Sequence, residues 1–350
     1  MSMATFDAIG GRVALRVPLR ALVVCLCLTV AIATVLLWSL MTGSYPLESA
    51  QVWATLIGNP PSDTAATVVW QFRFPRTLVA FIVGAFLALS GATLQYVTRN
   101  PLADPSLVGV SQGAALVVVT FTILFPEVGI FLRPFLAFAG SLIVAVLVLA
   151  ASSSRQRGGE TLRFILMGIG VAALISSFTS ALLTYGNVDR AMAALGWLAG
   201  SVHSVGWKEV VWLTATAALV IPALLVAARP LSAIRFGEET AISLGVQLRR
   251  ARLALVALAV ALAATAVAAV GPLGFVGLVA PHLARKLAHS GVGLHLLLTG
   301  LTGALMVGLA DFVGRTAFAP IQIPAGLVTA IIGVPVFVIL ILKTQGRNQL

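Results

Sequence analysis

The chain has 350 residues, of which 59% are hydrophobic and only 9% charged, and its mean hydropathy is +1.05. Because a soluble domain carries about a quarter charged residues, this composition excludes a soluble globular protein and indicates a polytopic membrane protein. The net charge of +11 is accounted for by basic loops on the cytoplasmic side of a membrane, so lipid is expected as a partner and nucleic acid is not.

Ten apolar segments of membrane-crossing character follow one another along the chain. In order they cover about 21–41, 75–97, 106–125, 134–151, 162–185, 208–228, 252–271, 274–289, 293–313 and 323–342. We therefore expect an all-α fold with one transmembrane domain over 21–342, a cytoplasmic N-terminal segment over 1–20 and a cytoplasmic tail over 343–350. The segment at 274–289 is short and flanked by Gly and Pro, which makes it the weakest of the ten.

The basic residues are unevenly shared between alternate loops. With a cytoplasmic N-terminus, six of the 22 Lys and Arg fall on the outer side: Arg73, Arg76, Arg133, Arg190, Lys208 and Arg315. The positive-inside rule then places both termini in the cytoplasm and requires an even number of crossings. The segment at 274–289 is kept as a crossing for this reason.

Three of the outer arginines stand out. Arg73 and Arg76 bracket Pro75 at the outer mouth of the second segment, and Arg315 follows Asp311 by four residues at the outer end of the ninth. One interpretation is snorkelling, or a helical Asp311–Arg315 pair. The other is a docking site for carboxylates of an external partner, which Arg binds in a bidentate manner.

Two further patterns concern glycine. Gly109 to Gly113 match G-x-S-x-G, the nucleophile elbow of serine hydrolases, but that motif requires a preceding strand and a histidine in reach. Here it opens an apolar helix, so packing by the two glycines is the favoured interpretation. Rows of small residues predict close helix packing: Gly84, Ala88 and Ala92 in the second segment, and Gly300, Ala304 and Gly308 in the ninth.

A charged island over 229–252 interrupts the apolar sequence. Glu238 and Glu239 follow Gly237, as expected at the start of a helix. Ala241, Leu244 and Leu248 would share one helical face, and Gly245 is a plausible stop signal. A short amphipathic helix on the basic side of a membrane protein predicts a contact with a soluble partner.

The sequence lacks the usual signatures of an energy source. It contains no G-x-x-x-x-G-K-[ST], so the chain is not expected to hydrolyse ATP itself. No H-E-x-x-H or other metal-ligand spacing is visible, and we expect no metal and no directly bound cofactor. Asp104 and Asp311 lie near helix ends, whereas an ion-coupled secondary carrier would place acids near the middle of the bilayer, which makes that class the less favoured alternative.

Several long segments together resemble the FecCD-type iron-siderophore, haem and cobalamin importer permeases, the membrane subunits of type II binding-protein-dependent ABC importers. The matching stretches cover residues 73–114, 237–246 (GEETAISLGV), 271–285 (GPLGFVGLVAPHLAR), 311–315 (DFVGR) and 323–337, in the family's order. The resemblance implies ten helices per subunit in the bacterial cytoplasmic (inner) membrane. It also implies a second permease subunit, identical or paralogous, two cytosolic ATPases that bind ATP and Mg, and an extracytoplasmic substrate-binding protein.

The resemblance also assigns roles to residues. It implies that Arg73, Arg76 and Arg315 dock the binding protein. The coupling segment that contacts the ATPase is identified as Gly237, Glu238, Glu239, Ala241, Leu244 and Gly245. Thr161 aligns with the inner gate region, and Ser176, Ser177, Ser180 and Thr184 give a polar side to the segment that would line the pathway. Hydrogen bonding of these hydroxyls to the preceding helical turn is an equal alternative.

The cargo expected from the resemblance is a ferric siderophore, with haem or cobalamin as the alternative. The G-P-L-G form at Gly271 is more similar to siderophore permeases than to the others. One departure concerns Gln322, because the family often has an acidic residue before the Pro-x-Gly step at Pro324. This departure weakens any assignment of a charged pair there.

Overall fold

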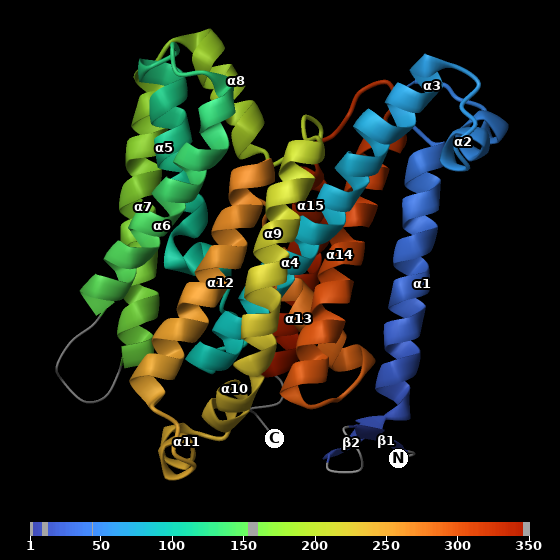
Figure 1. Cartoon of the computed structure of the whole chain (residues 1–350). Coiled ribbons are helices and arrows are strands. Elements are labelled where there is room, and N and C mark those ends of the chain that lie inside the picture. Colours follow the sequence, from blue (N-terminus) through green and yellow to red (C-terminus); the bar gives the residue numbers. More distant parts are fainter. Residues whose placement is uncertain (1–2, 9–12, 44, 153–159, 346–350) are drawn as a thin grey trace.

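The computed structural model describes residues 3–8, 13–43, 45–152 and 160–345, and from residue 19 onward these residues form a bundle of helices (Figure 1). A short antiparallel hairpin precedes the bundle, with β1 (Met3–Ala8) paired to β2 (Val13–Pro18). The sequence did not indicate this hairpin. The all-α architecture expected for the membrane domain is confirmed.

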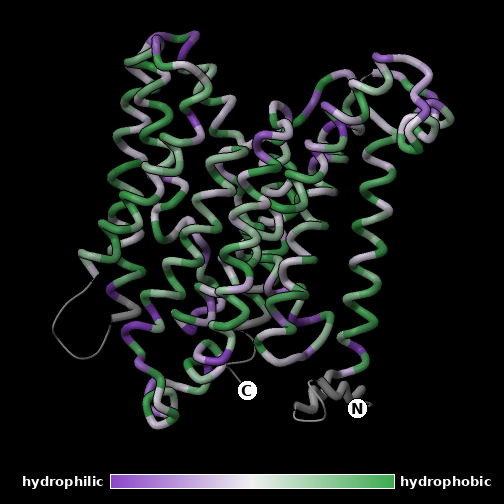
Figure 2. The backbone as a smooth tube through the Cα atoms, in the orientation of Figure 1, coloured by the Kyte–Doolittle hydropathy of each residue, from purple (hydrophilic) through white to green (hydrophobic). Residues whose placement is uncertain are grey.

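The long helices follow the predicted segments closely. They are α1 (Leu19–Met41), α4 (Phe74–Thr98), α5 (Val110–Leu124), α6 (Arg133–Ser152), α7 (Glu160–Tyr185), α9 (Trp207–Val226), α12 (Leu248–Val270), α14 (Val292–Thr316) and α15 (Ala325–Gln345). Seven helices in the described residues are long and apolar enough to cross a membrane, and the apolar parts of α5 and α15 are shorter. Apolar residues dominate the middle of the bundle and hydrophilic ones gather at its two ends (Figure 2).

Helix α13 (Val276–Leu287) corresponds to the weakest predicted segment. The chain enters α13 from the end of α12, at Val270, whose carbonyl accepts a hydrogen bond from Ser201 N–H. Ala284, near the end of α13, and Ala288, just after it, belong to one apolar cluster with Ala21 at the start of α1. The chain therefore returns along the bundle within about 20 residues, although only twelve of them are helical.

Helix α4 lies at the centre of the bundle. Its closest contacts with neighbouring helices are made at glycines, where backbone meets backbone. It continues without a break from α3 (Asp63–Thr67) through a π-helical segment, η1 (Val68–Arg73), so the apolar helix spans Asp63–Thr98. A Cβ on Gly84 would lie 2.2 Å from the Gly303 carbonyl oxygen on α14, and one on Gly91 would lie 1.9 Å from that of Gly277 on α13. The predicted row on α4 thus meets α14 at Gly303, whereas Gly300 and Gly308 of the predicted row on α14 face Leu89 and Phe81.

The glycines of the G-x-S-x-G pattern also serve packing. Gly109 has φ +79° and caps α5, and a Cβ on Gly113 would lie 2.3 Å from the carbonyl oxygen of Gly140 on α6. The packing interpretation of this pattern is confirmed.

Several short helices lie at the ends of the bundle and have no counterpart among the predicted segments. They are α2 (Ser49–Leu56), α3, α8 (Val188–Leu198), α10 (Ala228–Arg235) and the 3-10 turn η3 (Ile130–Leu132), whereas a second 3-10 turn, η2 (Pro105–Val108), overlaps the start of the predicted segment 106–125. Helices α3 and α8 lie at one end of the bundle, and α10 and α11 (Glu238–Ser243) at the other (Figure 1). We refer to these as the α8 end and the α11 end. Helix α1 begins at the α11 end, where α15 also ends (Figure 1).

Candidate functional site

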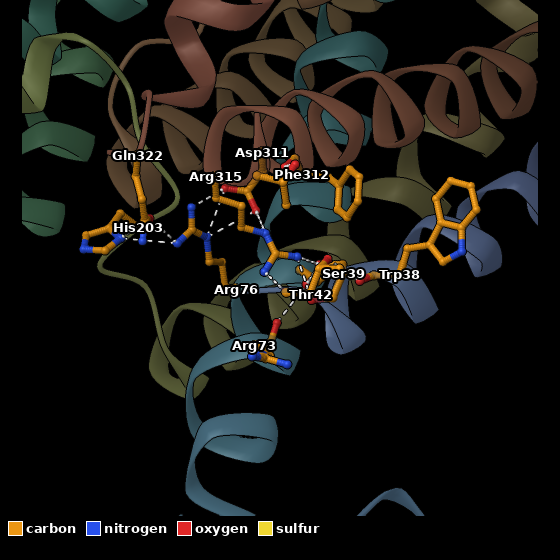
Figure 3. A network of polar contacts seen from close by, with 12 residues as sticks. Trp38, Ser39, Thr42, Arg73, Arg76, His203, Asp311, Phe312, Arg315 and Gln322 are labelled. Carbon is orange, nitrogen blue, oxygen red and sulfur yellow. Dashed lines mark hydrogen bonds and ion pairs between the residues drawn. The ribbon is translucent and has the colours of Figure 1, made fainter. Parts of the chain in front are cut away.

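Asp311 gathers two of the three predicted docking arginines at the α8 end (Figure 3). Its Oδ1 accepts hydrogen bonds from Arg76 Nε at 3.0 Å and Nη2 at 2.7 Å, and Arg315 Nε forms an ion pair with Oδ2 at 3.7 Å. The side chain of Asp311 is 4% exposed. The helical Asp311–Arg315 pair considered from the sequence is therefore present, and Arg76 from α4 provides the closer contacts.

Arg73 and Arg315 hold the end of α1. Arg73 Nη1 donates to the Leu40 and Met41 carbonyls at 2.6 and 3.2 Å, and its Nη2 donates to that of Tyr45 at 2.6 Å. Arg315 donates in the same way to backbone oxygens of Ser39 and Thr42 at 2.6 and 2.7 Å, and to the Ser39 hydroxyl. The last carbonyls of a helix have no partner within it, and basic side chains can satisfy them.

Both of these arginines are buried. Arg73 is 5% exposed and Arg315 is 4% exposed. Their donors therefore point into the protein, and in this conformation neither side chain presents its guanidinium to a partner.

Arg76 is the most accessible member of the group. Its Nη1 donates to Gln322 Oε1 at 2.9 Å, and the same oxygen lies 2.8 Å from His203 Nδ1 (Figure 3). The same Nδ1 also lies 3.2 Å from Arg76 Nη1, so Arg76, His203 and Gln322 form one polar cluster. Gln322 thus contacts Arg76 through its amide oxygen, and Asp311 supplies the carboxylate that neutralises Arg76.

A π-helical turn fixes where Arg73 and Arg76 lie. The N–H of Phe74 donates to the Val69 carbonyl, five residues back, and Pro75 has no N–H to offer the next carbonyl, that of Trp70. The indole Nε1 of Trp207 donates to this carbonyl oxygen at 2.7 Å, and its ring stacks on Phe74. The start of α9 is thereby fastened to the segment that carries the arginines.

Sequence reasoning did not single out Trp207 or His203. Pro75 was the available signal for Trp207, since a proline after a helical turn frees a carbonyl that some donor must satisfy.

The coupling segment lies at the α11 end, as Figure 1 shows. Gly237 has φ +119° and Gly245 has φ +81°, so glycine is required at both ends of α11. Ala241 is fully buried, and Glu238 and Glu239 lie in the first turn. The short helix and its glycine stop are confirmed.

The predicted common face of Ala241, Leu244 and Leu248 is wrong. The chain reverses at Gly245, where Val246 N–H donates to the Ala241 carbonyl, and a new helix, α12, begins at Leu248. Leu244 is consequently 66% exposed. Together with Phe236 and Ile242, which are 74% and 59% exposed, it gives the coupling segment an uncovered apolar surface.

The predicted gate and pathway residues all lie on α7. Thr161 falls in its first turn, although the predicted segment began only at residue 162. Ser176, Ser177, Ser180 and Thr184 are exposed. Ser177 and Thr184 donate to the carbonyls of Ala173 and Ser180, so for these two residues the alternative of bonding to the preceding turn is confirmed.

No resident metal site is visible in the described part of the chain, where no group of three or more His, Cys, Asp or Glu side chains could hold a metal ion.

Comparison with known proteins identifies the family of this chain. Residues 29–343 match the FecCD transport family. The chain is 36% identical to the Fe(3+)-citrate import system permease protein YfmE of Bacillus subtilis (strain 168), over 94% of this chain and 97% of that protein. It is 34% identical to the ferric enterobactin transport system permease protein FepG of Escherichia coli (strain K12), over 94% and 98%.

A haem permease and a solved structure are also similar. The hemin transport system permease protein HmuU of Yersinia pestis is 35% identical over 90% of this chain and 95% of its own length. A metal-chelate type ABC transporter, solved in an inward-facing conformation, superimposes with a TM-score of 0.81 at 29% identity and covers 91% of this chain and 99% of its own. The chain is a multi-pass membrane permease that belongs to the FecCD transport family.

Proposed function

We propose that this chain is the permease subunit of a binding-protein-dependent ABC importer that moves ferric siderophore inward across the bacterial cytoplasmic membrane. The observation that carries the proposal is near full-length similarity to permeases named for the import of Fe(3+)-citrate and ferric enterobactin. Haem is the second candidate cargo, because the hemin permease of Yersinia pestis is similar at almost the same identity. Cobalamin import by the same architecture is a third.

The energy would come from two partner ATPases that bind ATP and Mg. The coupling segment around Glu238 supports this assignment, because Phe236, Ile242 and Leu244 expose apolar surface beside its charged residues. Apolar anchors within a polar rim are typical of protein–protein contacts. Closure of the ATPases on ATP would displace this segment and switch the permease between its outward- and inward-open states.

The binding protein would dock at the α8 end. Arg73, Arg76 and Arg315 together carry three positive charges against the single carboxylate of Asp311, so this face attracts carboxylates. Arg76 would make the direct contact, because its side chain is 13% exposed and borders the exposed His203. Arg73 and Arg315 would contribute their charge and hold the neighbouring loop at Thr42 and Tyr45.

The pathway would form against a second permease subunit, identical or paralogous. The exposed hydroxyls of Ser176, Ser180 and Thr184 on α7 support this proposal, because a carrier needs polar contacts that bind cargo weakly and release it. Thr161 at the start of the same helix is proposed for the gate region.

The decisive experiment is transport in proteoliposomes that contain the permease, the ATPase and the binding protein. Uptake of ⁵⁵Fe-siderophore that requires ATP supports the proposal, and competition by haem or cobalamin tests the cargo. Uptake driven by a proton or sodium gradient without the ATPase would instead establish a secondary carrier.

Docking is tested separately with Arg76→Gln, and with Arg133→Gln as a matched control at the same end. We expect the Kd for the binding protein to rise about tenfold for Arg76→Gln, since a close charge pair contributes about 1.5 kcal/mol or more, and to stay unchanged for the control. Equal affinity of both variants and the unaltered protein would remove Arg76 from the docking site.

A further inference from the structure

Glu238, the first residue of α11, is held by arginines from two different helices. Its Oε1 accepts from Arg99 Nη2 at 3.1 Å and from Arg252 Nη2 at 2.6 Å. Arg99 caps the end of α4, and Arg252 lies near the start of α12. The neighbouring Glu239 is exposed and forms no ion pair within the described part of the chain.

Arg99 stands at a backbone position that favours another residue. Its φ of +50° and ψ of +27° are left-handed, and the cap at the end of a helix usually carries Gly or Asn there. A side chain with a Cβ costs free energy in this conformation. The presence of arginine therefore points to a use for its guanidinium.

That use is not the stability of the fold. The side chains of Arg99 and Glu238 are 45% and 40% exposed, and ion pairs at such exposure add little to the free energy of unfolding. The contacts instead fix the position of α11, because arginines from two helices of the bundle bind the same oxygen atom of Glu238.

Of the two helices, α4 is the one that could transmit a movement from one end of the bundle to the other. Helix α4 (Phe74–Thr98) is buried along most of its length, with Arg76 in its first turn and Arg99 at its C-cap, so the two arginines lie at its opposite ends. With a rise of 1.5 Å per residue, the 23 residue steps from Arg76 to Arg99 span about 35 Å. A movement of α4 at Arg99 would therefore be felt at the α8 end.

We propose that Arg99 and Arg252 are positioning residues that clamp Glu238, so that α4 and α12 move together with α11. Through α4 the clamp links the coupling segment to Arg76. Binding-protein docking and engagement of the ATPase then influence each other, as two sites coupled through one rigid element must. This inference rests on the proposed function, which supplies the two partners.

The test uses the assembled importer in proteoliposomes with three single variants. Arg99→Gly removes the guanidinium and relieves the left-handed backbone, so its melting temperature should be equal to or above that of the unaltered chain. Glu238→Gln removes the charge that both arginines contact. Glu127→Gln makes the same chemical change at an exposed residue in the loop between α5 and α6 and is the matched control.

We expect Arg99→Gly and Glu238→Gln to retain the ATPase on co-purification. Stimulation of ATP hydrolysis by the binding protein should fall at least fivefold in both, with a similar fall in iron transported per ATP hydrolysed. The Arg99→Gly/Glu238→Gln double variant should be no worse than either single variant, because residues that act as a unit are not additive. Glu127→Gln should remain within twofold of the unaltered protein.

Stimulation and transport at the unaltered level in Arg99→Gly and Glu238→Gln would overturn the clamp. Loss of the ATPase from either variant would overturn it as well, since the residue would then contact the partner directly. Failure of the unaltered importer to use ATP would instead refute the proposed function.

Discussion

The guanidinium of Arg73 donates to the carbonyl oxygen of Leu40 over 2.6 Å, and so joins the segment that leads into α4 to the last turn of α1. A second donor of the same side chain reaches the Tyr45 carbonyl in the loop beyond. Arg73 is therefore part of the structure at the α8 end before any partner arrives, which separates its role from that of Arg76.

Replacing Arg73 by Ala should destabilise the chain. The carbonyls of Leu40 and Tyr45 would lose buried partners, and each unsatisfied group costs about 1–3 kcal/mol. We expect a lower melting temperature in detergent and faster proteolysis of the loop after α1. Arg133→Ala is the control, and equal melting of the two variants would show that Arg73 does not support α1.

The apolar surface of the coupling segment gives a second prediction. Ile242→Ser and Leu244→Ser should leave the melting temperature unchanged, because both side chains are more than half exposed. Each should weaken binding of the ATPase by about 1–2 kcal/mol, the range of an interface anchor. Co-purification of the ATPase measures this binding. The control is Tyr185→Ser at the opposite end of the bundle, where Tyr185 is 90% exposed. Wild-type yield from both variants would exclude these side chains from the contact.

The contact between α4 and α14 gives a third prediction. A Cβ on Gly303 would lie 2.3 Å from both the Cβ of Ala88 and the carbonyl oxygen of Gly84, so Gly303→Ala must push the helices apart. The expected cost is about 1–3 kcal/mol, as for other overpacked sites. Gly293→Ala, on the same helix with no atom within 4 Å of its Cβ, should melt at or above the unaltered temperature. Similar melting of both variants would contradict the close packing.

Hydropathy and charge were sufficient to locate the ten long segments, because a bilayer demands about 20 apolar residues for each crossing. Helix α13, with twelve helical residues, also lies within the predicted segment 274–289, which the distribution of arginines favoured as a crossing. The short helices α2, α8 and α10 escaped because they do not cross and therefore leave no long apolar run.

The partners of the arginines could not be predicted. Arg73 and Arg315 bind main-chain carbonyls of residues 39–45, and every residue has a carbonyl, so no side-chain pattern marks them. The contact between Arg99 and Glu238 joins residues 139 positions apart. The predicted common face of Ala241, Leu244 and Leu248 was wrong because the chain reverses at Gly245. Leu248 therefore belongs to the next helix and not to α11.

Asp104 gives the last prediction, which concerns pH. It lies in the loop between α4 and α5, where its Oδ1 accepts from the Ser106 N–H at 2.9 Å and the Ser106 hydroxyl at 2.6 Å. Dense protein around the carboxylate raises the pKa of Asp104 above its usual value near 3.8, and the two hydrogen bonds from Ser106 oppose the shift only in part. The folded chain therefore binds a proton more readily here than the unfolded chain does.

The sign of the effect follows from linkage. Below the pKa that Asp104 has in the unfolded chain, this residue does not lower the free energy of unfolding. The destabilisation grows as the pH rises from that value through the higher pKa of the folded chain. Asp104→Asn keeps an oxygen for Ser106 without the charge, so it should melt above the unaltered chain at pH 7, with the difference shrinking as the pH approaches 4. Melting curves from pH 4 to 7 measure this difference. A difference that does not change with pH would show that the carboxylate of Asp104 has an ordinary pKa in the folded chain.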